Sequence, residues 1–135
     1  MKRYLLGLVL LLLCLPGCRQ APAQTADQAA QSLPPIEVHF SPKGGCTEAV
    51  VKELAAAKST VLVQAYSFTS VPIAKALVDA HKRGVKVEVI LDKSQRTEKY
   101  SSADFVLHAG IPTKIDSKHA IAHNKIMIID GQVGL

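Results

Sequence analysis

The segment that decides the fold and the chemistry of this chain runs from residue 121 to residue 131 and reads Ile-Ala-His-Asn-Lys-Ile-Met-Ile-Ile-Asp-Gly. Its apolar, β-branched part predicts a buried strand over residues 125–129 that ends at an Asp-Gly turn. Side chains two positions apart leave a strand from the same face, so we expect His123 and Lys125 to point into one site. A phosphodiester is a suitable substrate for such a site, because the lysine can hold its non-bridging oxygens while a neutral histidine attacks its phosphorus.

The same segment contains the spacing His-x-Lys-x-x-x-x-Asp, formed by His123, Lys125 and Asp130. This spacing resembles the HxKxxxxD signature of the phospholipase D superfamily. The signature alone arises often by chance, whereas five matching blocks in order do not. The other four resemble those of the small single-motif bacterial endonucleases of that superfamily: residues 38–42, 64–69, 76–78 with 82–85, and 110–112 with 116–117.

This resemblance implies two-step hydrolysis of a phosphodiester without a metal or a cofactor. His123 would attack phosphorus to give a phosphohistidine, while a second histidine protonates the leaving oxygen and then activates water. Lys125 would bind substrate oxygens, and Asp130 is the third candidate catalytic residue. Because one chain offers one motif, the resemblance implies a homodimer whose two copies of His123 and Lys125 share one active site.

The chain departs from the family after the motif. In the family the motif is followed by a strand, a Gly-Ser-x-Asn segment, an acidic residue that supports the histidine, and a final helix. This sequence stops at Leu135, before all of them. We therefore expect the catalytic domain, residues 36–135, to be truncated and to be unstable or prone to aggregation through an unpaired strand edge.

Two sets of candidate residues have a second interpretation. Asp130 lies five positions after Lys125 and cannot share its face on a regular strand, so it can instead fix the turn and accept backbone hydrogen bonds. Asp116, His119 and His123 could in principle form a metal site. Histidines four residues apart converge only on a helix, however, and the apolar run after them predicts a strand, so we expect no metal.

Strands and helices are predicted to alternate along the domain. This pattern is typical of an α/β fold with right-handed crossovers, in which a mostly parallel sheet is flanked by helices on both faces and is incomplete at the C-terminus. The expected strands cover residues 36–40, 60–66, 85–91, 111–115 and 125–129, and the expected helices cover residues 47–58, 70–84 and 102–108.

Functional residues of such a sheet gather where its parallel strands end. Tyr66 and Ser67 directly follow one predicted strand, and Asp92 follows the next. We therefore expect Tyr66 and Ser67 to bind substrate beside Lys125, and Asp92 to lie near the same edge. Ser67 has no Gly-x-Ser-x-Gly surroundings, which argues against a serine hydrolase.

The N-terminus has the features of an export signal. Residues 1–18 carry a short positive region and then an apolar run too short to span a bilayer, which is typical of a signal peptide. Cys18 follows a segment that resembles a bacterial lipobox, whereas residues 21–23 would serve an ordinary signal peptidase. Residues 19–35 are rich in Ala, Gln and Pro and predict a flexible linker. We expect a periplasmic protein or a lipoprotein anchored in the bacterial envelope.

The amino-acid composition says little about which class of molecule the protein binds. The formal net charge of +5 at pH 7 is compatible with a polyanion, but equally with an ordinary solvated surface. The absence of Trp and the scarcity of Tyr and Phe argue against a base-stacking platform, so contacts with nucleic acid should be to the backbone. We interpret the chain as an exported phosphodiesterase acting on DNA or RNA. The alternatives are a phospholipase D acting on phosphatidylcholine-type lipids, and an inactive remnant or binding module.

Overall fold

The computed structural model describes residues 36–135. The predicted signal peptide over residues 1–18, the linker over residues 19–35 and the candidate lipidation site Cys18 lie outside the described residues. Within residues 36–135, no helix has the length and apolar character needed to cross a bilayer.

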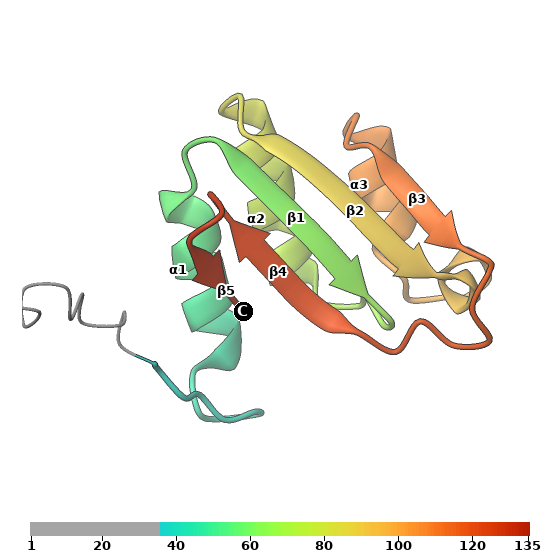
Figure 1. Ribbon diagram of the computed structural model, residues 1–135, viewed down its shortest axis with the longest axis horizontal. Helices are drawn as coiled ribbons and strands as arrows, with labels where there is room; N and C mark the ends of the chain where they lie inside the picture. Colours follow the sequence, from blue (N-terminus) through green and yellow to red (C-terminus); the bar gives the residue numbers. More distant parts are fainter. Residues whose placement is uncertain (1–35) are drawn as a thin grey trace, which may run out of the picture. The chain divides into compact units, whose positions relative to one another are not determined.

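A five-stranded mixed sheet forms the centre of the domain (Figure 1). The strand order is β3-β2-β1-β4-β5; β1, β2 and β3 pair in parallel, whereas β4 pairs antiparallel to β1, and β5 antiparallel to β4. The α/β class is thus confirmed, with an antiparallel half that the predicted, mostly parallel sheet did not include. The strands are β1 (Thr60–Ala65), β2 (Lys86–Asp92), β3 (Thr113–Asp116), β4 (Lys125–Ile129) and β5 (Val133–Gly134).

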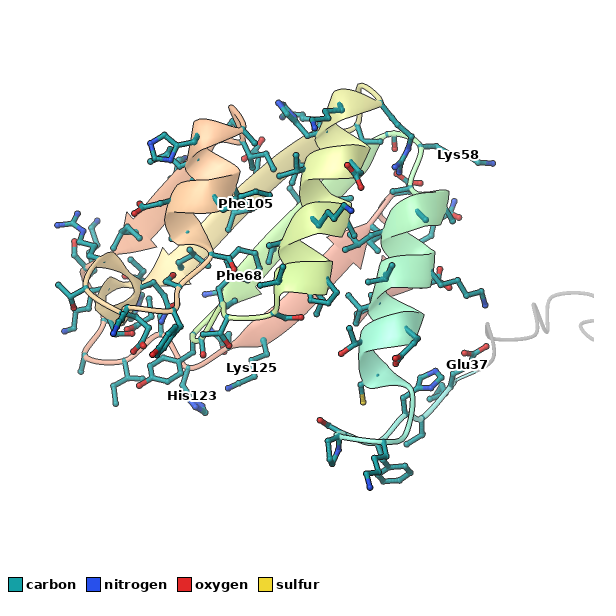
Figure 2. All side chains as sticks on the ribbon, turned by 180° about the vertical axis from the view of Figure 1, so that it is seen from behind. Glu37, Lys58, Phe68, Phe105, His123 and Lys125 are labelled. Atoms are coloured by element: carbon teal, nitrogen blue, oxygen red, sulfur yellow. The ribbon has the colours of Figure 1, made fainter. Side chains whose placement is uncertain are left out.

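The helices lie on one face of this sheet, and this corrects the prediction that helices flank both faces. Figure 1 shows all three α-helices behind the strands, and Figure 2 shows them in front when the domain is seen from behind. The chain adds β1, β2 and β3 in one direction, so right-handed crossovers place α2 and α3 on the same side. The helices are α1 (Cys46–Ala56), α2 (Val71–Lys82), α3 (Ala103–His108) and the short 3₁₀ helix η2 (Lys93–Arg96).

The core lies between the sheet and these helices. Alternate residues of β1 and β2 are buried, as period-2 side-chain alternation requires, and they pack against the apolar side of α2. On the other face of the sheet, four apolar residues of β1, β2 and β4 remain 40–46% exposed. These residues are Leu62, Ile90, Ile126 and Ile128.

The predicted first strand, residues 36–40, is wrong. Only Phe40 forms isolated bridges, to Gly44 and Gly45, within a tight turn. Val38 and Phe40 are 70% and 72% exposed, so the apolar side of the alternating pattern has no surface to bury it. Alternation alone therefore did not make a strand here, because no sheet edge pairs with the segment.

Candidate active site

His123 and Lys125 lie side by side at the edge where β4 begins (Figure 2). The Nζ atom of Lys125 is 3.2 Å from Nε2 of His123, and both side chains are exposed. Two-residue spacing on an extended segment produces this proximity, and the predicted juxtaposition is confirmed. A hydrogen bond donated by the Lys125 ammonium needs an acceptor lone pair on Nε2, and this is also the form of the imidazole that can attack phosphorus.

Tyr66 is the third residue of this group. It follows β1, and its backbone N–H donates to the carbonyl of Asn124 at 2.7 Å, which ties the end of β1 to the motif. The ring centroids of Tyr66 and His123 are 4.6 Å apart, and Nζ of Lys125 lies 5.6 Å from the Tyr66 ring centre. The aromatic ring thus limits the positions open to both catalytic candidates.

A hollow of about 270 Å³ opens beside Lys125 on the side of the sheet that the helices cover. Ser67 and Lys125, which the sequence suggests as substrate-binding residues, both lie in its lining. Much of the remaining lining is apolar and comes from α1, α2 and β4 through Val50, Ile73 and Met127. The ammonium group of Lys125 therefore lies next to both solvent and an apolar surface.

Asp92 fixes the backbone that leads into the motif. Its carboxylate is 2% exposed at the end of β2 and accepts hydrogen bonds from the backbone N–H of Ala122 at 2.8 Å and of Ser94 at 2.9 Å. These bonds, that of Ala122 first, lower the pKa of the Asp92 carboxyl to about 2, so it stays ionised. The position of Asp92 was predicted from the end of its strand, but its role in holding the residue before His123 was not.

Asp130 lies at the other end of β4, about 17 Å of strand away from Lys125. One carboxylate oxygen accepts from the backbone N–H of Lys58, and the other from the N–H and hydroxyl of Ser59 and the N–H of Thr60, all at 2.8–2.9 Å. These bonds, that of Thr60 first, hold the pKa of the carboxyl well below its usual range. Figure 2 shows Lys58 at the opposite end of the domain from His123.

The structure therefore does not bring Asp130 to His123 and Lys125, and its inclusion among the catalytic candidates is corrected to a structural role. Its φ of 53° and that of Gly131, 69°, form the left-handed hairpin turn that an Asp-Gly pair favours. The turn returns the chain as the short strand β5, which corrects the expectation that the sequence stops before the strand that follows the motif.

Gln95 is a supporting residue that the sequence interpretation missed. It is buried in η2, and its Oε1 accepts from the N–H of Phe68 at 3.1 Å and from the hydroxyl of Ser101 at 3.0 Å. This network fixes the segment that follows Tyr66 and Ser67. The only sequence signal was a polar residue in a short segment after Asp92, which does not distinguish a buried side chain from an exposed one.

Asp116 and His119, considered for a metal site, form a pair of their own. Nδ1 of His119 lies 2.6 Å from Oδ2 of Asp116. Within the part of the chain that the structure describes, no group of three or more His, Cys, Asp or Glu residues is arranged to hold a metal ion.

Comparison with known proteins shows the family of the chain. The family described as "Cardiolipin synthase, PLD-like domain" matches residues 50–135, which is more than half of the sequence. The chain belongs to the phospholipase D superfamily. A phospholipase D from Rickettsia typhi is 41% identical over 95 residues, which cover 70% of this chain and 47% of that protein.

Solved structures show the same relationship. Nuc from Salmonella typhimurium, a phospholipase D family member, superposes with a TM-score of 0.65 at 38% identity, over 70% of this chain and 63% of that one. NucT from Helicobacter pylori gives a TM-score of 0.51 at 26% identity, over 62% and 58% of the two chains. The present chain spans about half the length of the Rickettsia phospholipase D.

Proposed function

We propose that this domain hydrolyses phosphodiesters through a covalent phosphohistidine on His123. The observation that carries the proposal is the 3.2 Å contact between Nε2 of His123 and Nζ of Lys125 on an exposed edge. When a phosphate binds at this edge, the Lys125 ammonium would donate to its non-bridging oxygens instead of to His123. The Nε2 lone pair of His123 would then be free to attack phosphorus. Membership of the phospholipase D superfamily supports the same chemistry.

Two proton transfers complete the reaction. In the first step the N–P bond forms while the bond to the leaving oxygen breaks, and a second imidazole protonates that oxygen. In the second step the same imidazole takes a proton from water, which attacks phosphorus and releases His123. We assign the second imidazole to His123 of another copy of the chain, so the proposed active unit is a symmetric dimer.

The proposed substrate is a polynucleotide. The sequence resembles the small single-motif bacterial endonucleases, and the edge that carries His123 and Lys125 is open to a long ligand, since both side chains are exposed. The scarcity of aromatic residues favours contacts with the phosphate backbone rather than with bases.

A phospholipid is the second candidate substrate, favoured by two observations. A relative with 41% identity is named phospholipase D. In addition, the apolar hollow beside Lys125 offers a surface for the apolar part of a lipid whose phosphate is at the catalytic pair.

One experiment compares the substrates directly. The full chain is incubated with supercoiled plasmid and, separately, with phosphatidylcholine vesicles, both in excess chelator. We expect nicking of the plasmid, which persists in chelator and disappears in the matched His123→Asn protein. Choline release without nicking would reassign the substrate to phospholipid, and cleavage that requires an added divalent cation would contradict the proposed use of Lys125.

We also propose that the protein is exported and acts in the bacterial envelope, from the signal-like pattern of residues 1–18. Cell fractionation followed by globomycin treatment tests this proposal. Accumulation of an unprocessed precursor would identify Cys18 as a lipid anchor, whereas normal processing would support cleavage at residues 21–23. A cytoplasmic, uncleaved protein would contradict export.

A further inference from the structure

The loop that joins β3 to β4, residues 117–124, is exposed but firmly anchored along the catalytic edge. At its start Oδ1 of Asp116 accepts from the backbone N–H of Lys118 at 3.0 Å and of His119 at 3.3 Å. Towards its end Asp92 holds the N–H of Ala122. Groups carried by this loop are thus held in fixed positions beside the catalytic pair, a condition for binding with a low ordering cost.

Among these groups, the imidazole of His119 has the most clearly fixed orientation. Its side chain is 72% exposed, while that of Asp116, which holds its Nδ1 at 2.6 Å, is only 14% exposed. The hydrogen bond from His119 lowers the pKa of the Asp116 carboxyl, which remains charged and turned toward the protein. Nε2 of His119 makes no hydrogen bond to any residue of the described domain, so this oriented imidazole has a free polar atom for a ligand.

Two lysines accompany His119. Nζ of Lys93, at the start of η2, lies 3.3 Å from the carbonyl oxygen of His119, and the exposed Lys118 is its neighbour in the chain. The nearby carboxylates of Asp92 and Asp116 are engaged by backbone N–H groups and by His119, so they are not presented to solvent as free acids. In this strip, defined here as Lys93, Lys118 and His119, the charged groups that reach solvent are the two lysine ammonium groups.

We propose that the strip is a second phosphate-binding position, which contacts the backbone of a polynucleotide whose reacting phosphate lies at His123 and Lys125. This inference rests on the proposed function and deepens it. Lys118 and His119 follow β3, Lys93 follows β2, and Lys125 begins β4; three strand spacings, or about 14 Å, separate the end of β3 from the start of β4. A single phosphodiester does not cover that distance, whereas the successive phosphates of a nucleic acid strand do.

The test measures binding rather than cleavage. All proteins are full-length and carry His123→Asn, so that a labelled 12-nucleotide single strand stays intact during fluorescence anisotropy titrations over a range of salt concentrations. Lys93→Gln with Lys118→Gln is compared with Lys58→Gln with Lys82→Gln, which removes the same charge from exposed residues at the opposite edge. His119→Ala is compared with His108→Ala, at the end of α3.

We expect the strip pair to reduce the slope of log Kd against log salt by about 1.4, or about 0.7 for each lost contact with a single strand. The control pair should leave the slope nearly unchanged. His119→Ala should weaken binding about 3- to 10-fold, with no change for His108→Ala. A dinucleotide with one phosphodiester should bind all variants alike.

Equal slopes for the two lysine pairs would overturn the second phosphate position while leaving the proposed nuclease function in place. Failure of the proposed polynucleotide substrate would give a different result. If the His123→Asn chain binds phosphatidylglycerol vesicles but no oligonucleotide at any salt concentration, the polynucleotide substrate is wrong, and this inference falls with it.

Discussion

Asp92 and Ala122 are joined by a 2.8 Å hydrogen bond that fixes the backbone one residue before His123. The bond connects the end of β2 to the start of the motif across 30 residues of sequence. Because the same buried carboxylate also holds Ser94, its position is determined from two sides. The orientation of His123 therefore depends on a residue that cannot itself reach substrate.

The first prediction concerns this link. Asp92→Ala should lower kcat about 10- to 100-fold on bis(p-nitrophenyl) phosphate, with a smaller change in KM, because a misplaced nucleophile costs rate more than binding. Asp92→Asn keeps one acceptor and should recover part of the loss. The matched control is Asp79→Ala, which removes an exposed aspartate from α2. Equal effects on kcat at positions 92 and 79 would contradict a positioning role.

The second prediction separates the structural role of Asp130 from catalysis. Asp130→Ala leaves the N–H groups of Lys58, Ser59 and Thr60 without their acceptor, so Tm should fall by at least about 5 °C. Activity measured well below Tm should stay within about threefold of the parent protein. A variant with normal Tm and no activity would restore Asp130 to the catalytic set.

The third prediction is a pH dependence of stability. The folded-state pKa values of Asp92, about 2, and of Asp130, lower still, lie below the ordinary value of 3.8. The unfolded chain thus binds protons more readily, and the stabilisation is complete above about pH 4 and is lost as pH falls toward 2 and below. Urea unfolding between pH 7 and pH 2.5 should show the free energy of unfolding decreasing below about pH 4. Asp92→Asn and Asp130→Asn should each flatten this decrease.

The fourth prediction concerns the Tyr66 ring. Its contacts with His123 and Lys125 are made by the ring and not by the hydroxyl. Tyr66→Phe should therefore keep kcat/KM within about threefold, whereas Tyr66→Ala should lower it about 10-fold through loss of the aromatic and cation–π contacts. If Phe is as harmful as Ala, the hydroxyl itself acts on substrate and the packing interpretation is wrong.

Local pattern was sufficient to predict much of the fold. Helix α2 begins after Ser70 with Pro72 in its first turn, and ends in basic residues before Gly84. The strand at residues 125–129 and the Asp-Gly hairpin were also predicted from short-range rules, but the expected burial of that strand was wrong, because only Ile129 of its five residues is buried. Such rules succeed where the residues that determine the structure are neighbours in sequence.

Features set by distant partners were not predictable in this way. Residues 36–40 alternate like a strand but find no edge to pair with, and helices cover only one face because the parallel strands are added in a single direction. At the site, the pair of His123 and Lys125 follows from two-residue spacing. The burial of Gln95 and the bond from Asp92 to Ala122 depend on folded loops, which no local pattern specifies.

The proposed covalent intermediate can be observed directly. A ³²P-labelled phosphodiester is mixed with the full chain in excess chelator, quenched in alkali within one turnover, and the labelled peptide is identified after proteolysis. The account predicts label that is stable in alkali, labile in acid, located at His123, and absent from His123→Asn. Turnover without such label, or label of the same kind retained by His123→Asn, would contradict it.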